Sequence, residues 1–337
     1  MNVSSVIDIF EKHVPKHLAE KWDNTGLLIE PDKQLLVTTI FFTNDLTEDV
    51  LDEALSVKAN LIISYHPPLF KPMKAFLSRN WKDRIAMQCI ANNVAVYSPH
   101  TACDAVKGGV NDWLLSCFDL QESRPVLPSR EFLHCVMECL VTSEEQLMQA
   151  LSSHVDLKII LKRPFDNKMS LKILFPKQSK DEILPMLAKD PDIEVLLIQD
   201  CTPLSDAQTG MGRIGKLQTP LKLEECIKVV KKHVGLEHLR VTLGLNKRLD
   251  NEVSTVAVCA GSGSMVLQNV SADLYITGEM SHHDLLDVRH AGRSVILCEH
   301  SNSERGYLEH LKNQLLLDLP KINLVVSKVD KDPVTIM

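Results

Sequence analysis

Apolar and polar residues follow two alternating patterns along the first 125 residues. Near the N-terminus, Val6, Ile7, Phe10 and Val14 recur at the spacing of one helix face. Short apolar runs, rich in β-branched residues, separate further amphipathic stretches. We expect strands at 35–42, 60–64 and 94–98, and helices at 3–13, 46–58 and 81–92. Short strands that alternate with helices indicate βα units and a mainly parallel sheet.

The pattern changes near residues 122–130, where two prolines lie in a segment that we interpret as a linker. Beyond it we predict a strand, a helix, two strands, a helix and a strand, at 132–141, 143–154, 157–162, 170–175, 179–189 and 192–200. The order β-α-β-β-α-β is that of a ferredoxin-like unit. We therefore expect an inserted domain over 126–204, between two halves of a core at 1–125 and 205–337.

The βα pattern resumes in the second half of the core. We expect helices at 221–233 and 303–317, and strands at 256–260, 273–277, 294–298 and 321–328. The whole chain is thus predicted to be an α/β protein whose mixed or parallel sheets are flanked by helices, interrupted by a smaller α+β insert.

Composition narrows the class of protein. Hydrophobic residues make up 45% and charged residues 24% of the 337 residues, which excludes a disordered chain. The formal charge of −7 disfavours direct binding to nucleic acid, which depends on phosphate neutralisation. No apolar stretch is long enough for a membrane span, and the start of the chain has no targeting pattern. Nine scattered cysteines without a C-x-x-C motif indicate a reduced intracellular protein, which we place in the cytoplasm.

Polar side chains follow five of the predicted strands, where ligands bind in open α/β sheets. These residues are Asn44 and Asp45, Tyr65 and His66, His100 and Asp104, Glu279, and His300 and Glu304. Histidine and carboxylate ligands suit zinc, iron and manganese. The His100–Asp104 and His300–Glu304 pairs have i,i+4 spacing, which puts both side chains on one face of a helical turn. With His66 they make five ligands, more than one tetrahedral ion needs, so we expect a dinuclear site with a bridging carboxylate.

Structural interpretations stand beside the metal hypothesis. Ser301 and Glu304 also fit a capping box that opens a helix, and this explains Glu304 at least as well. His283 lies either in a proton relay or in the solvated first turn of a helix. The glycine turn at 261–264 fits phosphate binding at a helix N-terminus, but a tight βα turn that lets a helix pack is favoured. The chain has no G-x-S-x-G nucleophile elbow.

Eight motifs, spread over nearly the whole chain outside the insert, resemble those of the Nif-three-like family. This family is also called the GTP cyclohydrolase I type-two homologues and includes the bacterial YbgI and YqfO groups. The motifs are WDNTGLL at 22–28, TNDLTEDV at 43–50, LIISYHPPLF at 61–70, YSPHTACD at 97–104, GMGRIG at 210–215, CAGSGS at 259–264, YITGEMSHHD at 275–284 and CEHSNSE at 298–304. The YHPP and GEMSHHD forms most resemble the eukaryotic members.

The resemblance implies two divalent metal ions per subunit, zinc, iron or manganese, held by His66, Asp104, His300 and Glu304, with Glu304 bridging. His100 would be a further ligand or support one. Bacterial members carry two adjacent histidines where this chain has Tyr65 and His66, and a neutral phenol is a weak ligand. The resemblance also implies homo-oligomers, dimers or hexamers, and an insert comparable to the PII-like insert of longer bacterial members.

Two functions follow as hypotheses. The first is a metal-dependent hydrolase that acts on a nucleotide or another phosphate-containing small molecule, with His100, Glu279 or His283 as proton carriers. The second is a non-catalytic regulatory adaptor, similar to a transcriptional corepressor, that acts in the cytoplasm and nucleus through protein partners and without direct contact to nucleic acid. The resemblance leaves open whether the protein is an enzyme.

Overall fold

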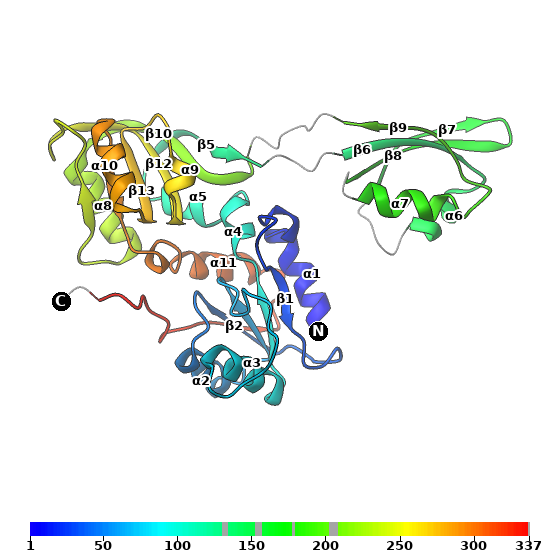
Figure 1. The fold of residues 1–337 in the computed structure, drawn as a ribbon, viewed down its shortest axis with the longest axis horizontal. Helices are drawn as coiled ribbons and strands as arrows, with labels where there is room; N and C mark the ends of the chain where they lie inside the picture. Colours follow the sequence, from blue (N-terminus) through cyan, green and yellow to red (C-terminus); the bar gives the residue numbers. More distant parts are fainter. Residues whose placement is uncertain (130–133, 152–156, 177–178, 202–207, 336–337) are drawn as a thin grey trace. The chain divides into compact units, whose positions relative to one another are not determined.

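The computed structural model describes residues 1–129, 134–151, 157–176, 179–201 and 208–335 (Figure 1). The chain divides into two compact units, one made of Met1–Pro128 with Ala207–Met337 and the other of Ser129–Asp206. Helices flank mixed sheets in the first unit, which confirms the predicted α/β fold class. No helix in the described ranges combines the length and the apolar character needed to cross a membrane.

The first sheet of the larger unit contains the parallel strands that were predicted from apolar runs. Its order is β1 (Gly26–Ile29), β4 (Ala95–Ser98), β3 (Leu61–Ser64), β2 (Thr39–Thr43) and β15 (Asn323–Val326). All neighbours run parallel except β1, which pairs antiparallel with β4 at the edge. Strands β2, β3 and β4 are buried along their whole length, as expected for strands covered on both faces.

Alternate residues of β2 pack on opposite faces of this sheet. Phe41 belongs to the apolar cluster formed with α2 (Glu48–Ser56) and α3 (Trp81–Ala91). Phe42 belongs to a larger cluster that includes α1 (Val3–His13) and α11 (Tyr307–Leu315). The alternation therefore decides which residues of the strand face each layer of helices.

The second sheet combines parallel and antiparallel pairs. Its order is β11 (Arg240–Thr242), β14 (Ser294–Leu297), β13 (Leu274–Glu279), β12 (Glu252–Ser262), β10 (Gly210–Lys222) and β5 (Leu120–Pro128). Strands β12, β13 and β14 are parallel. Helices α8 (Leu223–Val234), α9 (Ser264–Leu267) and α10 (His282–His290) follow β10, β12 and β13 along the chain.

Short helices and turns join the two sheets of the larger unit (Figure 1). They are α4 (Thr101–Ala105), α5 (Val110–Leu115), and the 3-10 turns at Lys16–Leu18 and Ser301–Ser303. Together with α11, the helices α4 and α5 and the turn at Lys16–Leu18 contribute to one apolar cluster that includes residues of both sheets. The ends of β2, β3 and β4 therefore lie close to the ends of β12, β13 and β14.

The segment predicted as a linker is instead the edge strand β5. It pairs antiparallel with β10, with Gly210 opposite Pro128 and Arg213 opposite Pro125. An edge strand tolerates proline because one side of its backbone is not needed for sheet hydrogen bonds. Strands β1, β10 and β11 were likewise not predicted from the apolar pattern.

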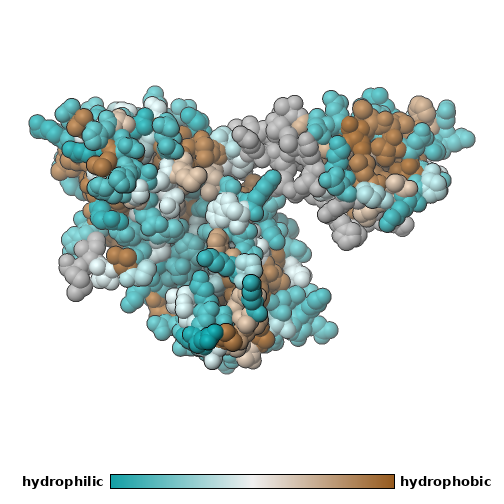
Figure 2. Space-filling view, viewed as in Figure 1, coloured by the Kyte–Doolittle hydropathy of each residue, from teal (hydrophilic) through white to brown (hydrophobic). Residues whose placement is uncertain are grey.

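The smaller unit has the element order β-α-β-β-α-β. It contains β6 (His134–Val141), α6 (Glu144–Leu151), β7 (Lys158–Phe165), β8 (Lys168–Pro176), α7 (Lys180–Leu187) and β9 (Glu194–Asp200). The antiparallel sheet has the order β7-β8-β6-β9, and its apolar core contains residues of both helices. Apolar side chains also gather on the visible surface of this unit (Figure 2), and the exposed ones in β7 and β9 include Ile160, Leu196 and Leu197. Assignment of this unit to the ferredoxin-like fold stays a prediction.

Candidate metal centre

His66, His300 and Glu304 meet in the larger unit although they are distant in sequence. His66 follows the end of β3, and His300 and Glu304 follow the end of β14. One ligand atom from each residue lies within 4.8 Å of the other two. The structure thus contains a His–His–Glu group that can hold a metal ion.

The distances within this group fit a metal ion. His66 Nε2 lies 3.4 Å from Glu304 Oε2, and His300 Nε2 lies 3.4 Å from Glu304 Oε1. Bonds of about 2.1 Å in tetrahedral geometry put neighbouring ligand atoms about 3.4 Å apart. Each histidine therefore faces a different oxygen of one carboxylate, and each nitrogen–oxygen separation is that of two ligands of one metal ion.

Both histidines of the cluster, and the neighbouring His100, have a carboxylate at the Nδ1 atom of the ring. The Nδ1 atom of His66 lies 3.0 Å from Asp45 Oδ1, that of His300 lies 2.8 Å from Glu279 Oε1, and that of His100 lies 2.7 Å from Asp23 Oδ1. A carboxylate at Nδ1 fixes the ring orientation and leaves Nε2 as the free donor. Such pairing is usual for histidines that ligate metals.

Two buried carboxyl groups give the cluster its electrostatic character. Burial raises the pKa of Glu304 well above its usual value, the Asp104 carboxylate raises it further, and the hydrogen bond from Asn44 opposes the rise. Burial also raises the pKa of Asp104, against the hydrogen bond that it accepts from the Tyr65 hydroxyl. Burying two acids together is unfavourable unless a cation neutralises them.

An orphaned polar atom lies beside the same carboxyl groups. The Asn44 side chain donates to Glu304 Oε2 at 3.1 Å, but its Oδ1 atom is buried and has no hydrogen-bond partner in the described part of the chain. A buried acceptor without a partner is costly unless it faces a donor or a cation. The donor set and this acceptor together fit a divalent metal ion.

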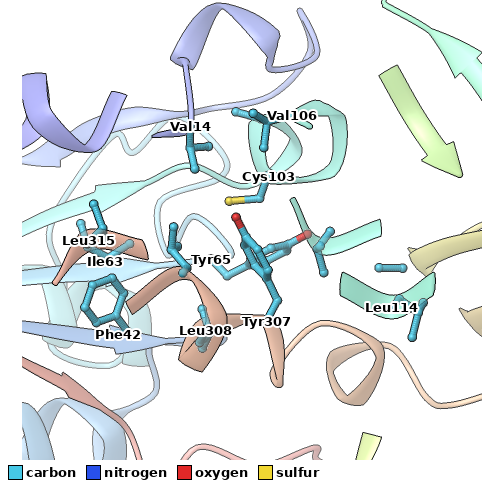
Figure 3. Packing of buried hydrophobic residues seen from close by; sticks show 14 of the residues in the cluster. Val14, Phe42, Ile63, Tyr65, Cys103, Val106, Leu114, Tyr307, Leu308 and Leu315 are labelled. Carbon is cyan, nitrogen blue, oxygen red and sulfur yellow. The ribbon is translucent and has the colours of Figure 1, made fainter. Parts of the chain in front are cut away.

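Tyr65 lies between the end of β3 and the candidate ligand His66. Its ring packs in the apolar core near Cys103 and Tyr307, as Figure 3 shows. Burial, and then the charges of Asp104 and Glu304, raise its pKa well above the usual value of tyrosine. Tyr65 therefore acts as a neutral hydrogen-bond donor that fixes Asp104.

His100 lies next to the cluster in a strained backbone conformation. Its φ angle is +35°, and its ring centroid lies 5.2 Å from that of His66. Unusual backbone angles in non-glycine residues persist where the surroundings enforce them, often at functional sites. The hydrogen bonds to Asp23 from the backbone N–H and the hydroxyl of Thr101 hold this turn in place.

The remaining predicted site residues lie in two different places. Glu279 contacts His300 at the end of β13, and its side chain is 49% exposed. His283 is exposed on α10, and within the described residues its ring neighbours His282 rather than the cluster. The capping-box interpretation of Glu304 is wrong, because α11 begins only at Tyr307 and the Glu304 carboxylate faces the two histidines.

Gly261 forms part of the wall of the cluster. Its φ angle is +65°, and a Cβ atom there would lie 2.6 Å from Glu304 Oε1 and 3.1 Å from His300 Nε2. The glycine turn after β12 thus lets the backbone approach the ligands. The helix that follows, α9, has only four residues.

Some supporting residues were not predicted from the sequence. Asp23 lies in a loop before β1, and Asp330 lies near the end of the chain. Asp330 accepts from the Asn44 backbone N–H at 2.6 Å and from Arg305 at 3.2 Å. Asp23 follows no predicted strand, so only the fold brings it to the site. Asp330 follows the strand predicted at 321–328, and this position was the signal that could have identified it.

Comparisons with known proteins place this geometry in context. The model of the family DUF34/NIF3, described as NGG1p interacting factor 3, matches residues 1–333. NIF3-like protein 1 of Bos taurus is 40% identical over 100% of this chain and 93% of its own length. NGG1-interacting factor 3 of Saccharomyces cerevisiae is 30% identical over 96% of this chain and 93% of its own length. A Bacillus cereus protein related to NIF3 is similar in structure, with a TM-score of 0.76, 26% identity and coverage of 100% and 99%.

Proposed function

Because the chain belongs to the DUF34/NIF3 family, we propose that it is a dinuclear metal-dependent hydrolase that acts on a nucleotide or another phosphate-containing small molecule. The observation that supports this proposal is the buried Glu304 carboxylate, whose two oxygens face two different histidine Nε2 atoms. A carboxylate in this arrangement suits a bridge between two ions.

Four residues would hold the ions. His66, His300 and Glu304 form the group that can bind one ion, and the buried carboxyl group of Asp104 would complete a second position. Zinc, iron and manganese all accept this donor set. When bound, two such ions would polarise the scissile group and lower the pKa of the attacking water.

The chain's own groups would position the substrate and move protons. His100 is the best placed proton carrier, because Asp23 holds its Nδ1 and its ring lies beside that of His66. Glu279 holds the Nδ1 atom of His300 and is half exposed, so it would exchange a proton with solvent. We assign no proton transfer to His283, whose ring lies against His282 on α10.

Metal content and hydrolysis in matched variants test this proposal. We expect about two metal ions per chain after purification without chelator, counted by inductively coupled plasma mass spectrometry. His300→Ala and His66→Ala should lose metal and hydrolysis of phosphate esters together. Glu48→Ala, which removes a surface carboxylate paired with Arg84, is the matched control and should keep both. A wild-type protein that stays metal-free after incubation with zinc, iron or manganese would contradict the proposal.

A second candidate function is a regulatory adaptor that acts through protein partners. The name of the yeast relative, NGG1-interacting factor 3, favours it. In this case the protein would work in the cytoplasm and the nucleus, as a homo-oligomer, and without binding nucleic acid directly. His66→Ala and His300→Ala would then lose metal but still capture the same partners from a cell extract. Loss of the captured partners in both variants, with the oligomer intact, would argue against a metal-independent adaptor.

A further inference from the structure

Two exposed aromatic rings, those of Trp22 and Phe70, lie near the metal-ligand cluster, and His100 lies between the Trp22 ring and His66. The Trp22 ring is 6.1 Å from the ring of His100, between centroids, and 6.2 Å from that of Phe70. Trp22 is 63% exposed and Phe70 is 42% exposed. Exposure of this much aromatic surface is unfavourable in water, and here it lies beside a group of polar ligands.

The loop that carries Trp22 is held firmly. Asp23, the next residue, accepts hydrogen bonds from Thr101 and pairs with His100. The Asn24 side chain donates to the carbonyl of Leu69, which joins this loop to the segment that carries Phe70. The planes of the two rings meet at 64°, edge to face, so a flat ligand can stack on the Trp22 ring and pack its edge against Phe70. The two rings therefore form a preorganised platform, and a ligand bound there loses little free energy in ordering the loop.

The segment that follows His66 is basic, although the chain as a whole is acidic. Residues 67–84 contain five Lys and Arg residues and one Asp. Three of these lysines, Lys71, Lys74 and Lys82, line a cavity of about 430 Å³ together with Phe70. None of the three pairs with a carboxylate among the residues that the structure describes. Phe70 is thus shared by the aromatic platform and the lysine-lined cavity.

We propose that Trp22 stacks on the base of a nucleotide and Phe70 packs against the edge of that base, while Lys71, Lys74 and Lys82 bind its phosphates. The assignment follows from two contacts: Phe70 belongs to both the platform and the lysine-lined cavity, and the Trp22 ring lies beside His100. Lysines alone would accept any phosphate, but an exposed tryptophan adds a preference for a flat aromatic ring. The inference rests on the proposed function, because it chooses nucleotides among the phosphate-containing substrates considered there.

Binding in the presence of a chelator tests this site without the metal. We would titrate the full chain, in EDTA, with ATP, with ribose 5-phosphate and with tripolyphosphate, and follow tryptophan fluorescence and calorimetric heat. Stacking on Trp22 should quench part of the fluorescence with ATP but not with the two probes that lack a base. The same titration with a 5′-phosphorylated single-stranded oligonucleotide distinguishes the two sources of base and phosphate. Tighter binding of ATP indicates a free nucleotide, and tighter binding of the oligonucleotide indicates the end of a strand.

Substitutions measure the contributions of the aromatic platform and of the lysines to binding separately. Trp22→Leu should weaken ATP binding about 5- to 100-fold and leave tripolyphosphate binding unchanged, and Trp22→Phe should restore most of the affinity. The double change Lys71→Ala and Lys74→Ala should weaken both ligands. Trp81→Phe is the control, because Trp81 is an exposed tryptophan that does not line the cavity, and a phenyl ring keeps the contact with Lys82.

The outcomes distinguish failure of this inference from failure of the proposed function. ATP binding that is equal in wild type, Trp22→Leu and Trp81→Phe would overturn the nucleotide platform, even if hydrolysis depends on His300 as proposed. Greater loss in Trp81→Phe than in Trp22→Leu would overturn it too. A protein that binds ATP through Trp22 but contains no metal and hydrolyses nothing would support the platform and refute the hydrolase.

Discussion

Removal of the Asp45 carboxylate tests whether the outer acids orient the metal-binding histidines. Asp45 Oδ1 lies 3.0 Å from His66 Nδ1, and on the opposite side of the ring His66 Nε2 faces Glu304. Burial raises the pKa of Asp45, but the hydrogen bond and charge of His66 outweigh it, so the pKa is lowered and Asp45 is ionised at neutral pH. Asp45→Ala removes the group that keeps Nε2 directed at the metal position.

The expected loss can be estimated from the geometry. Carboxylates that support a ligating histidine typically contribute 10- to 100-fold to metal affinity, about 1.4–2.7 kcal/mol. The Asp45 side chain is 39% exposed, so water replaces part of the lost hydrogen bond. We therefore expect Asp45→Ala to weaken zinc binding about 10-fold. Asp45→Asn keeps an acceptor oxygen and should weaken it only about 2- to 3-fold.

Competition with a chromophoric zinc chelator of known affinity measures these changes in the metal-free protein. Glu48→Ala is the matched control, because it removes the same charge from the exposed end of α2 without touching a histidine. Unchanged zinc affinity in Asp45→Ala would refute the orienting role. An Asn variant as weak as the Ala variant would show that the charge, rather than the acceptor, matters.

Three further predictions follow from the larger unit. Gly261→Ala should abolish metal binding and cost about 1–3 kcal/mol, seen in metal content and urea denaturation, because its Cβ would meet Glu304 at a left-handed backbone position; full metal content would contradict this. Arg213→Met should destabilise the protein by about 3–5 kcal/mol in urea, since it removes the buried partner of Asp112 at 2.8 Å; a loss below about 1 kcal/mol would refute a structural role. Burial raises the pKa of Glu53, but hydrogen bonds from the segment after β15 outweigh this effect, so the pKa is lowered overall. The ionised Glu53 carboxylate therefore contributes about 1 kcal/mol to the free energy of unfolding at pH 7, and this contribution disappears as the pH falls through the lowered pKa. Glu53→Ala should thus destabilise at pH 7 and not in acid, and an equal effect at both pH values would count against the assigned hydrogen bonds.

The family and the central strands were predictable because their signals are local. Apolar runs gave β2, β3 and β4, and the motifs around them gave the family resemblance that the family match confirms. Polar residues after strand ends gave His66, His300 and Glu304, because parallel strands end at one edge of a sheet. Strand β5 was wrongly taken as a linker, since prolines signal a break in the sequence and only pairing with β10 shows an edge strand.

The sequence by itself determined the α/β fold class and the residues that can carry chemistry, because periodicity and strand ends depend on neighbouring residues. Only the tertiary structure decided which of those residues meet. It brought Glu304 to two histidines rather than to a helix cap, left His283 outside the group that these three residues form, and brought Asp23 to His100. These contacts join residues far apart in the chain, so they depend on the packing of two sheets and the helices between them, which no local pattern encodes.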